Sequence, residues 1–383
     1  MRVTFARNLK ELDALSGAWQ RLASQIDNVL PFQTFAWTRA WWQVFQVSNL
    51  IRRDELMVTA YWEDDLLVAV IPRMITQYRF VGINIYHYIR PVGADPNLTE
   101  LRVPLMSPYF QEQVVEHWLA TVENFRDPHG LHKIIVPSQP PQAPEPDMFE
   151  QSIMDSMLMV TSNNRQLALL HTREISNFVV ETAENWDAFR KGLKRNIKES
   201  LRHCYNSLAK DKLTAELLVV SAPADIRAKL DAFCAMHGER AKLQSSVAHP
   251  DYFAKPQHRR FLNLLADQAE GVGMHLFCLQ VGGQTVAMRL GFVINTELYM
   301  YYSGYRQDHA KYSVMTTLVS EMIAWAHVQG VARINFSIGK DVSKTRWGPQ
   351  EILYVEQHFV RDTVAARTVG CFMLWLKTRR QSV

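Results

Sequence analysis

The chain has 383 residues, of which 48% are hydrophobic and 21% charged, so it can build ordinary globular cores in roughly two to three domains. Its formal net charge of +4 is mild, which suits an anionic substrate and does not indicate DNA as a partner. The four cysteines lie far apart without a C-x-x-C pair, which argues against a zinc site and against a disulfide framework. We therefore expect buried, reduced thiols and no metal.

No stretch approaches the roughly 18 apolar residues that a membrane span needs, and the N-terminus lacks the apolar run of a signal peptide. A short apolar run at residues 369–376 is followed by Lys377, Arg379 and Arg380. Such a segment either docks on the core as a terminal helix or lies on a membrane surface. We expect a cytoplasmic protein, with peripheral contact to the inner membrane as the alternative.

Hydrophobic periodicity predicts the elements of the first half in a clear order. Helices are expected at 9–26 and 34–45, a hairpin at 56–62 and 66–71, a helix at 110–125 and a strand at 131–136. The proline-dense segment 137–146 reads as a linker or as a rigid surface loop of the first domain. We place the domain boundary near residue 174, because residues 178–180 begin a new strand.

The second half repeats this succession of hairpin, helix and strand. Helices are expected at 186–208, 224–242 and 258–269, a hairpin at 275–281 and 285–294 around Gly282-Gly283, a strand at 298–302, a helix at 313–328 and a strand at 332–337. The sequence thus predicts two similar domains, residues 1–174 and residues 175–383, the latter with a C-terminal helix.

The segment from Leu298 to Trp347 carries the chemistry. A strand leads through the loop 303–312 into a helix that begins at Ser313, and a helix start offers free amides and a positive dipole end to an anion. Beyond the last strand follow Asp341 and the run Lys344-Thr-Arg346-Trp347-Gly348. No P-loop, no nucleophile elbow and no metal-binding motif occurs.

This ordered set resembles the CelD/BcsL-type polysaccharide-biosynthesis acetyltransferases of the GNAT superfamily, which are relatives of the FemAB peptidyltransferases. The resemblance implies an α/β fold of tandem GNAT-like domains, each a mixed and mainly antiparallel sheet flanked by helices, with the active site in the second domain. It implies acyl transfer from acetyl-CoA or another acyl-CoA to a sugar or a cell-envelope or exopolysaccharide precursor. A small molecule or glycan is then the acceptor.

The resemblance also implies roles for single residues. Lys344 would face the acyl carbonyl with Arg346 beside it, Tyr305 or Tyr312 would donate a proton to the leaving thiolate, and His237 would act as a base. Arg240, Asp341 and Trp347 would contact the acceptor. The residues expected to bind the cofactor are Tyr302, Ser303 and Gly304 beside the pantetheine, and His309, Ala310, Lys311, Tyr312 and Ser313 around the pyrophosphate.

Two observations keep other functions open. Residues 312–315 read Tyr-Ser-Val-Met where the family has Tyr-Ser-Pro-Gly, so the glycine that would let a phosphate approach is absent. A non-catalytic accessory protein of polysaccharide biosynthesis is therefore one alternative, and a FemAB-like transferase that uses aminoacyl-tRNA is another. The basic helix at residues 190–202 is read as a solvated face or as a grip for a nucleotide or an anionic glycan, and His237 as a base or as a partly exposed helix residue.

Overall fold

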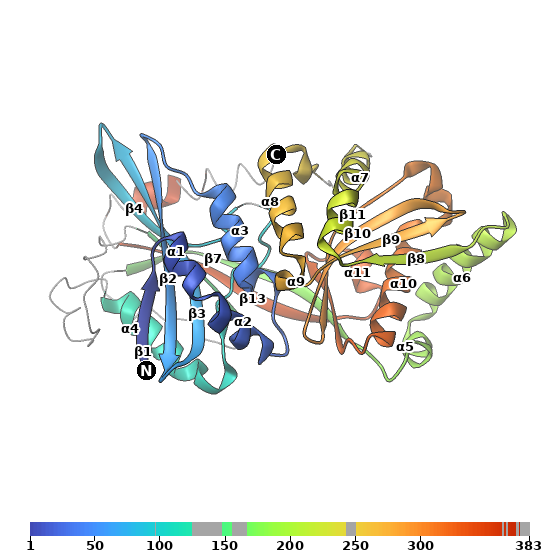
Figure 1. The fold of residues 1–383 in the computed structure, drawn as a ribbon, viewed down its shortest axis with the longest axis horizontal. Helices are drawn as coiled ribbons and strands as arrows, with labels where there is room; N and C mark the ends of the chain where they lie inside the picture. Colours follow the sequence, from blue (N-terminus) through green and yellow to red (C-terminus); the bar gives the residue numbers. More distant parts are fainter. Residues whose placement is uncertain are drawn as a thin grey trace. The chain divides into compact units, whose positions relative to one another are not determined.

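The computed structural model describes residues 1–95, 97–124, 148–154, 167–242, 250–361, 364, 367–372 and 375 (Figure 1). The chain divides into two compact units: the first unit comprises Met1–Ile26, Phe32–Ile175 and Leu353–Val383, and the second comprises Asp27–Pro31 and Ser176–Ile352. The expected boundary adjoins this division at Ile175. The chain beyond Ile352, however, returns to the first unit instead of completing the second. The predicted linker and the strand expected at 131–136 lie outside the described residues.

The first unit is built on a sheet of six main strands in the order β1-β2-β3-β4-β6-β13. Their bounds are β1 Arg2–Ala6, β2 Arg52–Glu63, β3 Leu66–Phe80, β4 Ile83–Pro91, β6 Met148–Met154 and β13 Gln350–Arg361, and the short β5 Leu105–Met106 pairs with β3. The helices are α1 Leu9–Ala14, α2 Ser16–Ser24, α3 Phe35–Phe45 and α4 Gln111–Asn124, with the 3-10 turns η1 Pro31–Gln33 and η2 Pro108–Phe110. The pair β4–β6 is parallel, and the other pairs described between the main strands are antiparallel.

The second unit repeats this arrangement with the strand order β8-β9-β10-β11-β12-β7. Its strands are β7 Leu167–Glu181, β8 Ala215–Val220, β9 Met274–Val281, β10 Gln284–Ile294, β11 Glu297–Tyr305 and β12 Arg333–Ile338. Its helices are α5 Trp186–Gly192, α6 Arg195–Lys210, α7 Pro223–Ala241, α8 Pro256–Asp267, α9 Ala269–Val272, α10 Val314–Val328 and α11 Val342–Thr345, with η5 Tyr252–Ala254 and η6 Gln307–Tyr312. Again one inner pair, β11–β12, is parallel. The predicted fold, two domains each with a mixed and mainly antiparallel sheet flanked by helices, is confirmed.

Local sequence signals explain where several helices begin. The side chains of Asn8, Thr34 and Asn185 accept hydrogen bonds from backbone N–H groups three residues further on, which caps α1, α3 and α5. Pro223 occupies the first turn of α7, where its missing N–H costs nothing. The helix expected at 186–208 is divided into α5 and α6, because Leu193 and Lys194 adopt extended backbone angles after Gly192.

The sheet of the second unit is covered on both faces. Figure 1 shows α7 and α8 on one side of it and α5, α6 and α10 on the other. Apolar residues of α5, α6 and α10 pack with those of β9, β10, β11 and β12 in one buried cluster that includes Leu201, Met300, Leu318, Phe336 and Trp347. This packing fixes the N-terminal end of α10 and the residues after β12 against the same face of the sheet.

Candidate active site

The two parallel strands at the centre of the second unit part from each other. β11 and β12 pair only at Glu297↔Arg333, Leu298↔Ile334 and Tyr299↔Asn335. Beyond these pairs β11 continues to Tyr305 and β12 to Ile338 without further pairing between them. The carboxyl ends of the strands therefore diverge where the sequence places its candidate residues, and ligands of open α/β sheets gather at such ends.

A β-bulge distorts β11 at the same place. Between the pairs Gly291↔Met300 and Arg289↔Ser303, β10 advances by two residues and β11 by three, so the extra residue lies at Tyr301 or Tyr302. The Tyr302 ring then packs among His237, Tyr252 and Phe253, with ring centroids 5.0 to 5.6 Å away. Tyr302 thus belongs to an aromatic cluster beneath α7. The bulge itself was not predicted from the sequence.

Gly304 allows α7 to approach β11 closely. A Cβ at this position would lie 2.4 Å from the backbone nitrogen of His237, which no side chain tolerates. The His237 ring is buried, its Nδ1 lies 3.0 Å from the carbonyl oxygen of Ser303, and burial lowers its pKa. His237 is therefore not the partly exposed residue of one interpretation, and its role as a base stays a prediction. It packs α7 onto the strand.

One turn further along α7, Arg240 brings the predicted residues together. Its Nη1 donates to Ser303 Oγ at 2.7 Å, and Arg289 Nη2 lies 3.4 Å from the same hydroxyl. Burial lowers the pKa of the Arg240 guanidinium, while the neighbouring Tyr305 and Asp341 side chains act in the opposite direction. The positive charge of Arg240 thus faces Tyr305 at the end of β11 and Asp341 beyond the end of β12.

Lys344 lies on the same side of this site. Its Nζ donates to the carbonyl oxygen of Ile338, lies 3.5 Å from Ser337 Oγ and 3.9 Å from Asp341 Oδ2. The side chain is 18% exposed, so the ammonium group is largely sheltered yet accessible. Asp341 caps α11 by accepting from the backbone N–H of Ser343 at 2.8 Å, which fixes the short helix that carries Lys344.

Arg346 points elsewhere, toward α6 and the start of α10. Its Nη2 donates to Ser200 Oγ at 2.6 Å. Burial raises the pKa of the nearby Cys204 thiol, and the facing hydroxyls of Thr317 and Ser313 together with the Arg346 charge partly offset this rise. Arg346 therefore lies at the N-terminal end of α10, whose first amides have no partner within the helix. A guanidinium and free amides together suit an anion.

The segment before α10 is more ordered than the expected loop. Gln307–Tyr312 forms the 3-10 turn η6, Ser313 adopts a left-handed conformation with φ of 53°, and its N–H donates to the carbonyl of Ala310 at 2.9 Å. The N–H of His309 donates likewise to Arg306, at 3.2 Å. Two of the amides expected to hold a pyrophosphate, those of His309 and Ser313, are thus already bound to backbone carbonyls.

Two carboxylates hold the side chains of η6. Asp211 accepts from the Tyr312 hydroxyl at 2.5 Å and from Lys311 Nζ at 2.9 Å, and these bonds lower the pKa of Asp211. Asp308 binds Arg306 at 2.6 Å and lies 2.7 Å from His309 Nδ1. The Tyr312 hydroxyl is therefore committed to Asp211, which leaves Tyr305 as the better placed proton donor of the two expected.

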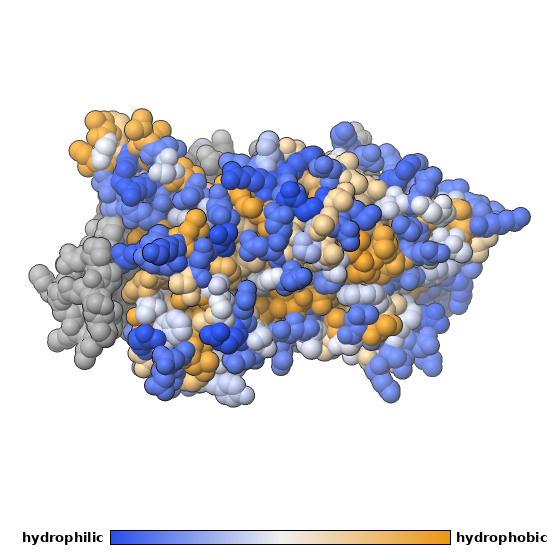
Figure 2. Space-filling model, viewed as in Figure 1, coloured by the Kyte–Doolittle hydropathy of each residue, from blue (hydrophilic) through white to orange (hydrophobic). Residues whose placement is uncertain are grey.

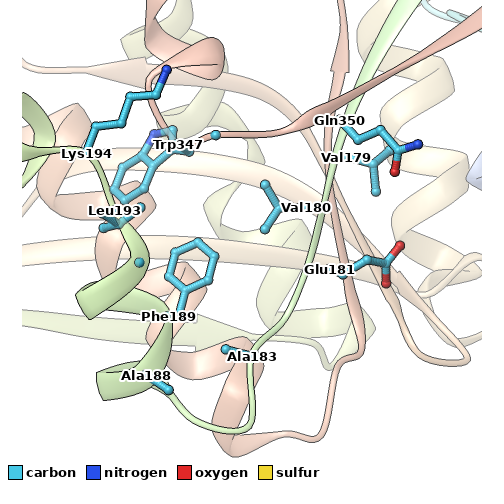
Figure 3. A pocket seen from close by; sticks show the side chains of 12 residues that line it. Val179, Val180, Glu181, Ala183, Ala188, Phe189, Leu193, Lys194, Trp347 and Gln350 are labelled. Atoms are coloured by element: carbon cyan, nitrogen blue, oxygen red, sulfur yellow. The ribbon is translucent and has the colours of Figure 1, made fainter.

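A pocket of ≈ 420 Å³ opens beside Trp347 (Figure 3). Its lining comes from the end of β7, from α5 and the residue before α6, and from the segment after α11: Val179, Val180, Glu181, Ala183, Ala188, Phe189, Gly192, Leu193, Lys194, Trp347, Gly348 and Gln350. The figure shows the rings of Phe189 and Trp347 with Val180 around an apolar interior, and the polar groups of Lys194, Glu181 and Gln350 around them. The volume suits a small ligand.

The other sequence predictions concern the cysteines, the C-terminal segment, membrane spans and metal binding. Three cysteines are buried, whereas Cys371 is exposed. Gly370 lies against Val360 and Leu170, with a Cβ position 2.6 Å from the Val360 side chain, so the described part of the C-terminal segment docks on the first unit. Within the part of the chain that the structure describes, no helix has the length and apolar character to cross a membrane, and no group of three or more His, Cys, Asp or Glu is placed to hold a metal ion.

Comparison with known proteins identifies the type of domain. Residues 194–345 match the family model described as "Acetyltransferase (GNAT) domain". Over these residues the second unit is similar to a GNAT domain. The segment matched begins at Lys194 and ends just after Lys344, so it includes α6, α7, both strands of the site and α10. The CelD/BcsL-type assignment within this superfamily stays a prediction. No sequence among the curated proteins matches this chain.

Solved structures show the same fold over nearly the whole chain. FemX has a TM-score of 0.58 at 8% identity and covers 93% of this chain and 97% of its own. The C-terminal domain of a putative lysylphosphatidylglycerol synthetase from Agrobacterium fabrum has a TM-score of 0.51 at 12% identity, covering 94% and 95%. A conserved protein of unknown function from Bacteroides thetaiotaomicron has 0.50 at 11%, covering 94% and 99%. At such identities the likeness shows the fold alone.

Several residues of the site were not found by sequence reasoning. Ser200 and Cys204 on α6 and Arg289 on β10 contact expected residues from elements that carried no recognised motif. The pocket lining on α5 and β7 was missed as well. Ser200 lies within the predicted basic helix, whose interpretation rested on its charged residues and not on its inner face.

Proposed function

We propose that this protein is an acyltransferase that moves an acyl group from acyl-CoA to a hydroxyl or amine of a sugar or of a cell-envelope or exopolysaccharide precursor. The observation that carries the proposal is the convergence of Arg240, Ser303, Tyr305, Asp341 and Lys344 where β11 and β12 part. This convergence lies within the segment that matches the acetyltransferase family model.

The residues at the start of α10 fit the anionic end of such a donor. The first amides of α10 and the Arg346 guanidinium would bind a pyrophosphate. The nearby carboxylates are already bound, Asp308 of the preceding turn to Arg306 and Asp211 at the end of α6 to Lys311 and Tyr312. When bound, acyl-CoA supplies an activated thioester carbonyl. The fit rests on charge and on helix geometry, and not on the glycine that the family has at this helix start.

The chemistry of the site itself is electrostatic. Lys344 is placed to stabilise negative charge that develops on the carbonyl oxygen, because its sheltered ammonium is fixed by the Ile338 carbonyl and lies near Asp341. Arg240 holds Ser303 and keeps a second positive charge facing Tyr305. The Tyr305 hydroxyl would donate its proton to the leaving thiolate. The pocket beside Trp347 would receive the acceptor, since it adjoins the segment that carries Lys344.

A second candidate is transfer of an aminoacyl group from tRNA, as in FemAB-type enzymes. Two observations favour it: the fold likeness to FemX extends over nearly the whole chain, and α5 and α6 expose basic residues toward solvent, among them Arg190, Lys191, Lys194 and Arg202. A polyanion would bind such a surface in a salt-dependent way. The two candidates share the site at Lys344 and differ in the donor.

Calorimetric titration of the full chain with acetyl-CoA tests the donor. Binding with a dissociation constant below about 1 mM, weakened by Arg346→Gln and not by Arg306→Gln, is the expected result, because both arginines are basic but only Arg346 lies at the start of α10. Absence of heat at millimolar acetyl-CoA, combined with a gel shift by aminoacyl-tRNA, would establish the second candidate. Absence of both would leave an accessory role in polysaccharide biosynthesis.

A further inference from the structure

An exposed apolar tip on the first unit has no role in the site described above. Residues 80–85 form the end of the β3–β4 hairpin, where the side chains of Phe80, Val81, Ile83 and Ile85 are between 62% and 83% exposed. Figure 2 shows this cluster as orange spheres at the upper left, over the ends of β3 and β4. Single exposed apolar residues are ordinary on protein surfaces, whereas a contiguous group marks an interaction site.

A neighbouring turn enlarges the same surface. Residues 49–52 form a turn in which the Asn49 side chain accepts from the N–H groups of Ile51 and Arg52, so that Leu50 and Ile51 point outward, 91% and 69% exposed. The N–H of Arg79 donates to the carbonyl of Ile51 at 2.7 Å, which joins this turn to the hairpin. Two loops that are distant in sequence thus present six large apolar side chains together; we call residues 49–53 and 79–85 the hairpin tip.

The tip is not optimised as a turn. Val81 adopts a left-handed conformation with φ of 47°, followed by Gly82 with φ of 78°. A β-branched residue is strongly disfavoured there, and asparagine before glycine is the preferred sequence for such hairpin turns. An apolar side chain is therefore kept at the outermost position at a cost in local stability, which indicates a function for it.

The charges around the tip select the partner. Residues 48–53 and 76–87 contain three arginines, Arg52, Arg53 and Arg79, and no carboxylate. Asp54 and Glu55 pair with Arg52 and Arg53, but Arg79 donates to the neutral oxygens of Asn84 at 2.9 Å and Gln77 at 3.2 Å. The positive charge of Arg79 is therefore not neutralised by these partners. A surface with apolar and anionic character is complementary to this pattern.

We propose that the hairpin tip anchors the protein to an anionic lipid surface by inserting Phe80, Val81 and Ile83 at the boundary between headgroups and acyl chains. From Arg79 to Val81 the strand rises roughly 7 Å, about the depth of 5–10 Å to which interfacial elements bury their apolar groups. Arg79 then lies at the level of the headgroups, where arginine keeps its charge in water while its aliphatic part is covered. This proposal does not depend on whether the active site uses acyl-CoA or aminoacyl-tRNA as its donor.

Flotation of the full chain with vesicles tests the anchor. Wild type is expected to float with phosphatidylcholine vesicles that contain about 30 mol% phosphatidylglycerol, and much less with vesicles of phosphatidylcholine alone. The triple variant Phe80→Ser, Val81→Asn, Ile83→Ser should lower the partition coefficient by at least about 30-fold, because three apolar groups no longer leave water. Val81→Asn alone should lower it severalfold while favouring the turn.

A matched control uses a valine of the same exposure. Val328 at the end of α10 is 81% exposed against 83% for Val81, so Val328→Asn should leave flotation unchanged. Arg79→Gln should weaken binding to the anionic vesicles and not to the neutral ones. The proposal is overturned if folded wild type does not float, or if the triple variant floats like wild type. It is equally overturned if wild type forms dimers that the triple variant abolishes, without flotation, since a second copy would then cover the tip.

Discussion

Replacing Lys344 by methionine tests whether this lysine has a catalytic role or only a structural one. Lys344 Nζ donates a hydrogen bond to the Ile338 carbonyl oxygen. The substitution removes this bond, in which the donor is charged. Such a loss lowers the free energy of unfolding by about 1.5–3 kcal/mol at most. If the ammonium also stabilises the carbonyl oxygen in the transition state, turnover should fall on the order of 100–1000-fold, which corresponds to about 3–4 kcal/mol.

The two effects are measured separately. Urea denaturation gives the stability change, calorimetry with acetyl-CoA gives donor affinity, and a thiol-release assay gives turnover with an acceptor. Lys340→Met is the matched control, because Lys340 lies four residues earlier, is 70% exposed and pairs with Glu351 at 3.4 Å. We expect both variants to fold and to bind acetyl-CoA, and only Lys344→Met to lose turnover. Equal turnover in wild type and Lys344→Met would remove Lys344 from the mechanism.

Three further predictions address packing, the pocket and pH. Gly304→Ala should destabilise the fold by about 1–3 kcal/mol in urea denaturation, since its Cβ would meet the His237 amide, whereas Gly192→Ala has open space and should not. Ala188→Trp should raise KM for the acceptor in the thiol-release assay by narrowing the pocket, and Ala209→Trp on the exposed face of α6 should leave it unchanged. The pKa of His237 is lowered on folding, so its contribution to stability is present above the unfolded value of about 6.5 and is lost as pH falls below it. His237→Asn should therefore be less stable but show a shallower acid loss, and equal pH slopes would contradict this.

Strongly periodic segments could be predicted because their apolar spacing is decisive. The helices α3, α7 and α10 and the hairpin β9–β10 lie where the sequence places them. Some elements that the sequence did not predict depend on partners far along the chain. β13 pairs with β6 over Tyr354↔Met154 to Val360↔Met148, which returns the C-terminal segment to the first unit, and no local pattern contains that pairing. Local periodicity likewise cannot show that α5 and α6 are separate helices.

The convergence of the site could be predicted, but the directions of its side chains could not. Residues at the ends of neighbouring parallel strands meet at one sheet edge, which brings Tyr305 and Asp341 near each other from the chain order alone. Lys344 and Arg346, however, are two residues apart on a single helical turn, so they cannot share a face. The structure directs Lys344 to the end of β12 and Arg346 to Ser200 on α6. The family resemblance had instead implied that Arg346 lies beside Lys344 at the acyl carbonyl.

The two units share a topology, and both contain buried polar groups. In the first unit, Asp95 accepts from Trp41 Nε1 at 2.8 Å and from the Thr99 hydroxyl at 2.8 Å, and Arg102 pairs with Glu356, which also lies 3.0 Å from His358. These hydrogen bonds and ion pairs join loops and strands of the unit.

In the second unit two cations lie at the ends of the parting strands. Arg240 and Lys344 donate to neutral oxygens of Ser303 and Ile338, and Lys344 Nζ also lies 3.9 Å from Asp341 Oδ2. A fixed cation in a partly buried place acts strongly on charge that develops nearby. The position of Arg240 and Lys344 at the ends of β11 and β12 is the structural reason for expecting the second unit to carry the reaction.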